Sequence, residues 1–172
     1  MTTVLAWYGK MTDLLAKVIL SLAGLIVGLD VLSIFAEAVG RYVVGQSRAF
    51  MEELPRLAVP LIVFPMMGVL LKMKKHISVD LLPEKLKGRA RSLVLVCVYT
   101  VVLAVAIQFL LAGIIAVAHY RELGFETQTE IVFKTWITYL PFPIGFGLLI
   151  LFVVELLLAE LVNLVRLRGE GR

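Results

Sequence analysis

The stretch Ser92–Ala118, SLVLVCVYTVVLAVAIQFLLAGIIAVA, decides the fold class because it is long, apolar and free of formal charge. About 20 such residues suffice to cross the ~30 Å hydrocarbon core of a bilayer as a helix. The rest of the chain agrees, since 60% of its 172 residues are hydrophobic and 17% are charged. Soluble domains average about 45–50% apolar and about 25% charged residues. The composition therefore predicts an integral membrane protein and excludes most soluble enzyme folds.

Further apolar stretches flank this one on both sides. The spans expected besides residues 92–118 are residues 14–36, 51–72 and 135–160. The charge-free part of the second, Leu57–Leu71, is short for a bilayer, so it must borrow length from both ends while Lys72 reaches back toward the headgroups. We expect an all-α integral membrane protein with four transmembrane helices, forming a single membrane domain over residues 1–172.

The charge distribution predicts the orientation of these spans. The loop 72–91 carries seven basic and two acidic residues, whereas the loop 119–134 carries two basic and three acidic ones. Because Lys and Arg collect in cytoplasmic loops, the basic loop should be cytoplasmic and the acidic loop periplasmic. Both termini then lie inside. This bias also accounts for the net charge of +4, which needs no nucleic-acid partner.

A helical pattern precedes the first span. Apolar residues recur at helical spacing from Val4 to Val18, with Thr3, Lys10 and Asp13 elsewhere on the wheel. This pattern is typical of an amphipathic interfacial segment that lies along the membrane before the chain turns into it. The alternative is a cytosolic extension of the span itself, and the pattern alone does not separate the two.

Ionisable side chains at membrane depth are costly and are candidates for function. Asp30, Glu37 and Arg41 fall on one helical face, and Glu37 and Arg41 are four residues apart with the acid first, the favourable order for an ion pair. This face should look toward another helix, another subunit or water. For Glu37 and Arg41 a charge pair among the headgroups is the alternative.

A second charged group opens the span at residues 51–72. Glu52 and Glu53 stand near the positive end of the helix dipole, Pro55 suits a first helical turn, and Glu52 and Arg56 are again four residues apart. One interpretation is a helix start with a local salt bridge. The other is a polar socket that joins the outer ends of the first two helices, with Arg41 and Arg48 as counter-charges.

Three smaller groups complete the candidate residues. His76 and Asp80 follow the basic end of the second span, and Trp136 and Tyr139 should sit at the outer interface. Small residues should permit close helix contacts, namely Gly24, Gly28 and Gly113. Anionic lipid headgroups should be held by basic residues, namely Lys72, Lys74, Lys75, Arg89 and Arg91.

The common patterns of enzyme chemistry are missing. His76 and His119 fall on opposite sides of the membrane and cannot ligate one haem. Cys97 is the single cysteine, and no metalloprotease, nucleophile-turn or phosphate-loop motif occurs. We therefore expect no enzyme activity, cofactor or metal site. A stand-alone proton-coupled exporter that uses Asp30 or Glu37 remains an alternative function.

Several motifs together resemble a known family. They are Gly40-Arg41 leading to Glu52-Glu53-x-x-Arg56, then His76-Ile-x-Val-Asp80, then Trp136-Ile-x-Tyr139 followed by Pro141-x-Pro143-Ile-Gly145. In this order they resemble the small membrane subunit of the tripartite ATP-independent periplasmic (TRAP) transporters. Phe50 departs from the tryptophan that the family often has there, and the acidic pair still matches.

This resemblance implies a division of labour. A periplasmic protein captures a carboxylate substrate, and a large membrane subunit carries it inward with sodium across the bacterial inner membrane. The small subunit enlarges the fixed scaffold and binds neither substrate nor sodium. On this interpretation the charged residues of the first two helices lock these helices together or dock the large subunit, and Pro141 and Pro143 belong to the outer interfacial motif. The expected partners are the two other subunits and phospholipids.

Overall fold

The computed structural model describes residues 2–45, 49–73, 88–127 and 132–169. It is helical throughout these ranges apart from short connections. The elements are α1 (Thr2–Val39), the π-helix η1 (Gly40–Val44), α2 (Ala49–Lys72), α4 (Arg89–Leu123), α5 (Thr135–Tyr139) and α6 (Pro141–Gly169). The predicted helical stretches are confirmed. α1 and α4 continue beyond their predicted apolar spans into polar flanks, and α2 begins two residues earlier than predicted. The fourth stretch consists of two helices, α5 and α6, which meet at Leu140.

Three of the described helical stretches are long and apolar enough to cross a membrane, namely Ala6–Val43, Arg89–Leu123 and Thr135–Arg166. The apolar part of α2, Leu57–Lys72, is shorter. It contains Pro60 and Pro65 within a continuous helix. The apolar part of the second span is therefore short, as predicted. Whether the chain has three or four spans depends on whether α2 crosses the membrane.

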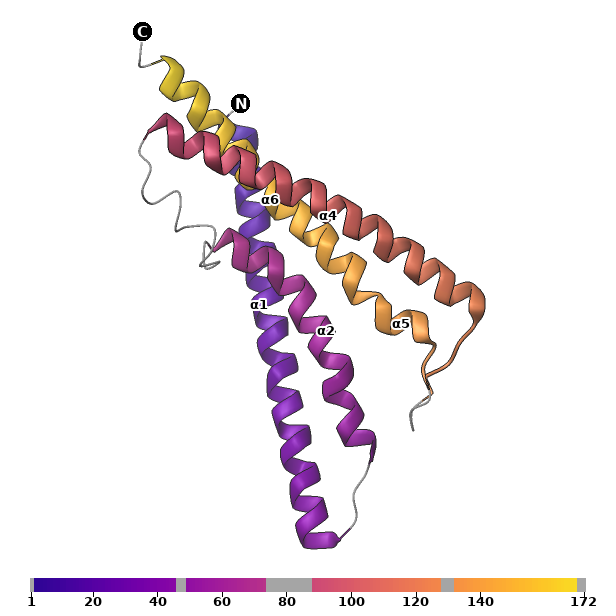
Figure 1. The fold of residues 1–172 in the computed structure, drawn as a ribbon. Coiled ribbons are helices and arrows are strands. Elements are labelled where there is room, and N and C mark those ends of the chain that lie inside the picture. The colour runs from indigo at the N-terminus through magenta and orange to yellow at the C-terminus, as the bar shows by residue number, and fades with distance from the viewer. Residues whose placement is uncertain (1, 46–48, 74–87, 128–131, 170–172) are drawn as a thin grey trace.

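The amino-terminal segment is continuous with the first span. α1 is one helix of 38 residues from Thr2 to Val39, and Figure 1 shows it running without a turn past α6 and alongside α2. The expected turn from an interfacial segment into the bilayer is therefore absent, and the structure favours the alternative, an extension of the span. The reason lies in packing, since this end of α1 contacts α6, as shown below.

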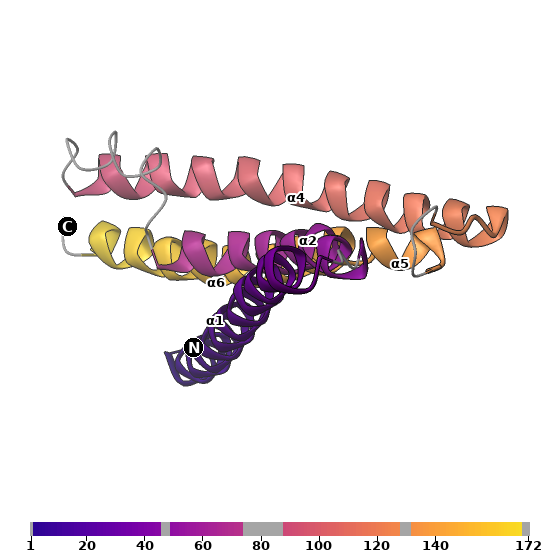
Figure 2. The same ribbon diagram turned by 90° about the horizontal axis from the view of Figure 1, so that it is seen from below.

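The helices pack in pairs (Figures 1 and 2). α4 lies along α6, α2 packs on α6 where the two overlap, and α1 crosses α6 obliquely while running beside α2. The junction end of α1 and α2, near residue 45, diverges from the end where α4 finishes at Leu123 and α5 begins at Thr135. The amino and carboxyl ends of the chain lie at the same end of the assembly.

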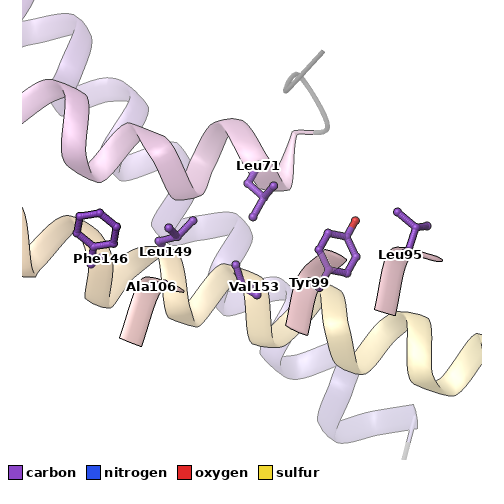
Figure 3. Packing of buried hydrophobic residues seen from close by; sticks show 7 residues of the cluster. All are labelled: Leu71, Leu95, Tyr99, Ala106, Phe146, Leu149 and Val153. Carbon is purple, nitrogen blue, oxygen red and sulfur yellow. The ribbon is translucent and has the colours of Figure 1, made fainter. Parts of the chain in front are cut away.

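A continuous apolar core joins α2, α4 and α6. Figure 3 shows Leu71 of α2 pointing toward α6, with the other members of this core spread along α4 and α6. The members of this core are Leu71, Leu95, Tyr99, Ala106, Phe146, Leu149 and Val153. A smaller cluster of Ile19, Val69 and Phe152 connects α1 to α2 and α6. Val153, Val69 and Phe152 are fully buried, so side chains of α2 and α6 are closed off from the surroundings at the centre of the chain.

Glycines set the distance between the paired helices. A Cβ at Gly145 of α6 would lie 2.4 Å from the Cβ of Phe64 and 2.6 Å from its carbonyl carbon. At Gly113 of α4 a Cβ would lie 2.7 Å from the ring of Phe142. The close contact predicted for Gly113 is confirmed. A Cβ at Gly24 or Gly28 would meet nothing within 4 Å, so the predicted contacts at these two glycines are not made inside this chain.

Candidate functional site: a lysine cluster where three helices meet

The ammonium group of Lys72 lies at the point where α1, α2 and α6 come together. Its Nζ is 2.6 Å from Oδ1 of Asp13 and 3.1 Å from Oε2 of Glu155, and it donates a hydrogen bond of 2.7 Å to Oγ1 of Thr12. The carbonyl oxygen of Gly9 lies 3.4 Å away. We call Thr12, Asp13, Lys72 and Glu155 the Lys72 cluster. It ties the last turn of α2 to the other two helices.

The hydrogen bonds of this cluster are complete on the lysine side. An ammonium has three N–H donors, and the three short contacts with Thr12, Asp13 and Glu155 account for them. The Thr12 hydroxyl accepts from Lys72 and donates to Oε2 of Glu155 at 2.7 Å. The hydroxyl of Thr12 on α1 therefore bridges Lys72 of α2 and Glu155 of α6.

Burial separates the two ion pairs. The side chains of Lys72 and Glu155 are 14% and 15% exposed, whereas that of Asp13 is 62% exposed. Thr12 is fully buried. Exposed pairs contribute about 0–1 kcal/mol, but a sheltered pair is costly to break because the remaining charge stays unpaired. Lys72 with Glu155 is therefore the structurally decisive contact.

Two further contacts hold α1 against α6 beside the cluster. The Tyr8 hydroxyl donates to the carbonyl oxygen of Leu151 at 3.0 Å. A Cβ at Gly9 would lie 3.4 Å from Oε1 of Glu155, an ordinary van der Waals contact, so α1 passes directly beside this carboxylate. Trp7, by contrast, is 67% exposed, in keeping with an aromatic residue at a membrane surface.

The structure gives Lys72 a different neighbourhood from the one expected. Sequence patterns assigned it to lipid headgroups, but its ammonium points into the protein. Arg89 and Arg91 are exposed at the start of α4, while Lys74 and Lys75 lie outside the described residues. Sequence reasoning missed Thr12, Asp13 and Glu155. Glu155 could have been found, because it interrupts an apolar span and the rule applied to Asp30 applies to it equally.

The predicted pair of Glu37 and Arg41 is confirmed. The Arg41 guanidinium donates to the Glu37 carboxylate across the junction of α1 and η1. Glu37 is buried and the Arg41 side chain is 54% exposed. Asp30 is half-buried two turns earlier, and within the described part of the chain its carboxylate makes no hydrogen bond or ion pair. The two acids thus have different environments on the same helix.

Some predicted residues cannot be placed. The backbone of Glu52, Glu53 and Arg56 belongs to α2, but their side chains lie outside the described part of the structure, and so do His76 and Asp80 entirely. The polar socket between the first two helices therefore stays a prediction.

The aromatic residues at the other end of α4 form a second small cluster. The rings of Tyr120 and Tyr139 stack with centroids 4.4 Å apart, and the Tyr139 hydroxyl donates to that of Tyr120 at 3.3 Å. The Arg121 guanidinium lies 5.9 Å from the ring centre of Trp136. Pro141 begins α6 directly after α5, where its missing N–H ends one helix and suits the start of the next. Trp136 and Tyr139 of α5 thus contact Arg121 and Tyr120 of α4, and their place at the outer interface stays a prediction.

These elements define a multi-pass helical membrane protein whose polar contacts join helices. Within the described ranges, no group of three or more His, Cys, Asp or Glu side chains could hold a metal ion. The chain matches the family described as tripartite ATP-independent periplasmic transporters, DctQ component, over residues 30–163. It belongs to this family and is a DctQ-like small subunit of a TRAP transporter. The family is a transporter component and not an enzyme family. No curated protein matches the chain.

Proposed function

We propose that this chain is the scaffold against which the large membrane subunit of a TRAP transporter works. In this proposal a periplasmic binding protein delivers a carboxylate, and the large subunit moves it inward with sodium. The small subunit binds neither of them. Family membership supports a TRAP complex that contains a large membrane subunit and a binding protein. The proposed location is the bacterial inner membrane, with both termini in the cytoplasm.

One observation carries the scaffold role. Only 11%, 11% and 17% of the three apolar windows are buried inside the chain. The helices are fastened at the Lys72 cluster and the apolar core, and most of their remaining surface faces outward. Such a surface must be covered by lipid or by another membrane protein. In this proposal the Lys72 cluster and the apolar core hold the helices together as a rigid frame. The moving part of the large subunit requires such a frame.

The stand-alone exporter is not favoured. Such an exporter would use Asp30 or Glu37, and the carboxylate of Glu37 is already paired with Arg41. The family match also points to a multi-subunit carrier.

We expect the chain to copurify with the large TRAP subunit of the same organism and to be recovered poorly when that subunit is omitted. Charge reversal by Glu52→Arg or Arg56→Glu should lower the recovered complex several-fold, because both residues are proposed to lock helices or dock the partner. Lys134→Glu reverses an exposed charge and should have little effect. Affinity purification through a tagged large subunit measures how much complex each of the three variants forms.

Two results would contradict this proposal. Transport by the chain reconstituted alone would refute the scaffold role, and drug resistance on solo expression that Asp30→Asn abolishes would establish the exporter. If the charge reversals left assembly intact and lowered transport, the residues would act in coupling and the packing role would be wrong.

The orientation is tested by cysteine labelling in intact cells. Cys97 is the single cysteine of the chain, so it is first replaced by alanine to leave each new cysteine as the one possible site of labelling. A new cysteine at Glu126 should be labelled by a membrane-impermeant maleimide, and one at Lys85 should be labelled only after the membrane is opened. The reverse pattern would invert the proposed topology.

A further inference from the structure

A groove lies between α1 and α2 beside the Lys72 cluster. It encloses about 280 Å³ and is bordered by Lys72 together with Asp13, Ala16, Lys17, Leu20, Val69 and Met73. Val69 is fully buried at its base, whereas Leu20 and Met73 are 44% and 47% exposed. The groove therefore combines an apolar floor with charged side chains at one end.

The charges of α1 place this groove at a membrane surface. Between Lys17 and Glu37 the helix carries one charged residue, Asp30. At 1.5 Å per residue this interval is about 30 Å long, the thickness of the hydrocarbon core. The groove thus lies where α1 enters the bilayer at its amino-terminal end. This placement does not depend on which side of the membrane that end faces.

The order of chemical groups along the groove matches the order of groups in a phospholipid. Moving into the membrane, α1 presents the carboxylate of Asp13, then the ammonium of Lys17 one turn later, then the apolar side chain of Leu20. Asp13 is largely exposed although it contacts Lys72. Lys17 is exposed, and within the described residues its ammonium makes no hydrogen bond or ion pair. Lys17 is therefore available to bind an anionic group.

We propose that the groove binds one phospholipid with a primary amine in its headgroup, of the phosphatidylethanolamine type. Lys17 receives the phosphate, and Asp13 accepts hydrogen bonds from the ammonium. The first part of the acyl chain lies against Ala16 and Leu20 of α1. The ammonium of Lys72 already has its partners within the protein. Lys17 is therefore the lysine that binds the lipid.

The charge balance selects this headgroup. Charge-assisted hydrogen bonds are the strong ones, and a hydrogen bond from an ammonium N–H to the Asp13 carboxylate carries a charge on both partners. A choline headgroup has no N–H donor. A glycerol headgroup offers no positive charge, so its lipid would add a net negative charge to a site where Lys17 and Lys72 already balance Asp13 and Glu155. The zwitterion with a primary amine satisfies both ends of the groove.

The test uses the purified complex, or the chain alone where that is stable, after delipidation in detergent. Phosphatidylethanolamine, phosphatidylcholine and phosphatidylglycerol with the same acyl chains are added in turn, and bound lipid is counted by native mass spectrometry. We expect phosphatidylethanolamine to bind about tenfold more tightly than the other two. Asp13→Asn should reduce its affinity to that of phosphatidylcholine, and Lys17→Gln should weaken both. Lys10→Gln, which removes an exposed charge from the same helix outside the groove, should change neither.

Other outcomes overturn the proposal. Preference for phosphatidylglycerol would show a simple basic site, and an unchanged preference in Asp13→Asn would remove the role of the carboxylate. Absence of bound lipid in the complex together with binding to the free chain would show that the partner subunit covers the groove. Within the described residues Lys17 makes no hydrogen bond or ion pair with the Lys72 cluster, so the result for Lys17→Gln stays interpretable if Asp13→Asn lowers stability.

Discussion

Replacing Lys72 by methionine should lower the free energy of unfolding by about 3–5 kcal/mol, the usual cost of removing one partner of a buried ion pair. Methionine keeps most of the length and apolar stem of the lysine. It leaves the carboxylate of Glu155, which is 15% exposed, beside a buried Thr12 hydroxyl with no positive charge. The cluster joins three helices, so α1 should also loosen from α6. Thermal unfolding in detergent, followed by tryptophan fluorescence and by size-exclusion profile, measures the loss.

Two companion variants separate charge from packing. Lys72→Met combined with Glu155→Leu should recover most of the stability, because neither charge is then left unpaired. Asp13→Asn should cost no more than about 1 kcal/mol, because that side chain is largely exposed. If the single methionine variant were as stable as the parent, or if the double variant were no better than the single one, the Lys72–Glu155 contact would not hold the helices together.

Gly145→Ala should be the second most damaging change, although alanine is the better helix former. The new Cβ would overlap the Cβ, carbonyl carbon and carbonyl oxygen of Phe64, at 2.4, 2.6 and 2.7 Å. Backbone atoms cannot rotate away as a side-chain tip can, so α2 and α6 must separate. Overpacking costs about 1–3 kcal/mol, and we expect the upper end, partly offset by about 1 kcal/mol of helix propensity. Loss of thermal stability and of partner recovery measures it.

Gly147 supplies the matched control. It lies two residues further along α6, and a Cβ there would meet nothing within 4 Å. Gly147→Ala should therefore be neutral or should stabilise the chain by up to about 1 kcal/mol. Equal effects at the two positions would show that helix propensity alone is being measured and that α2 and α6 are not in close contact at Gly145.

The helices were predictable because lipid imposes a simple rule. Every backbone N–H and C=O in the hydrocarbon region must be satisfied internally, so a long apolar run such as Ser92–Ala118 has few alternatives to a helix. The pair of Glu37 and Arg41 was predictable for a related reason. Both residues belong to one helix, and its fixed geometry brings positions four apart together.

Contacts between helices were much harder to predict. Lys72 at the end of an apolar run has the pattern of a lysine that reaches for headgroups, and the same pattern fits one that points inward. Gly24 and Gly28 have the spacing of a helix contact, yet the close approaches occur at Gly68, Gly113 and Gly145. Spacing along one helix indicates a face, but it does not indicate what that face meets.

By itself the sequence determined that the chain is a helical membrane protein, where its helices run, and which family it resembles. These properties follow from local rules, namely apolar length, helical spacing and charge counts along one segment. The tertiary structure decided that α1 continues straight into the protein, that Lys72 meets Thr12, Asp13 and Glu155, and that a groove opens beside them. Those contacts join residues up to 143 positions apart. They depend on the angle and depth at which helices cross, which only the packing of all their side chains together sets.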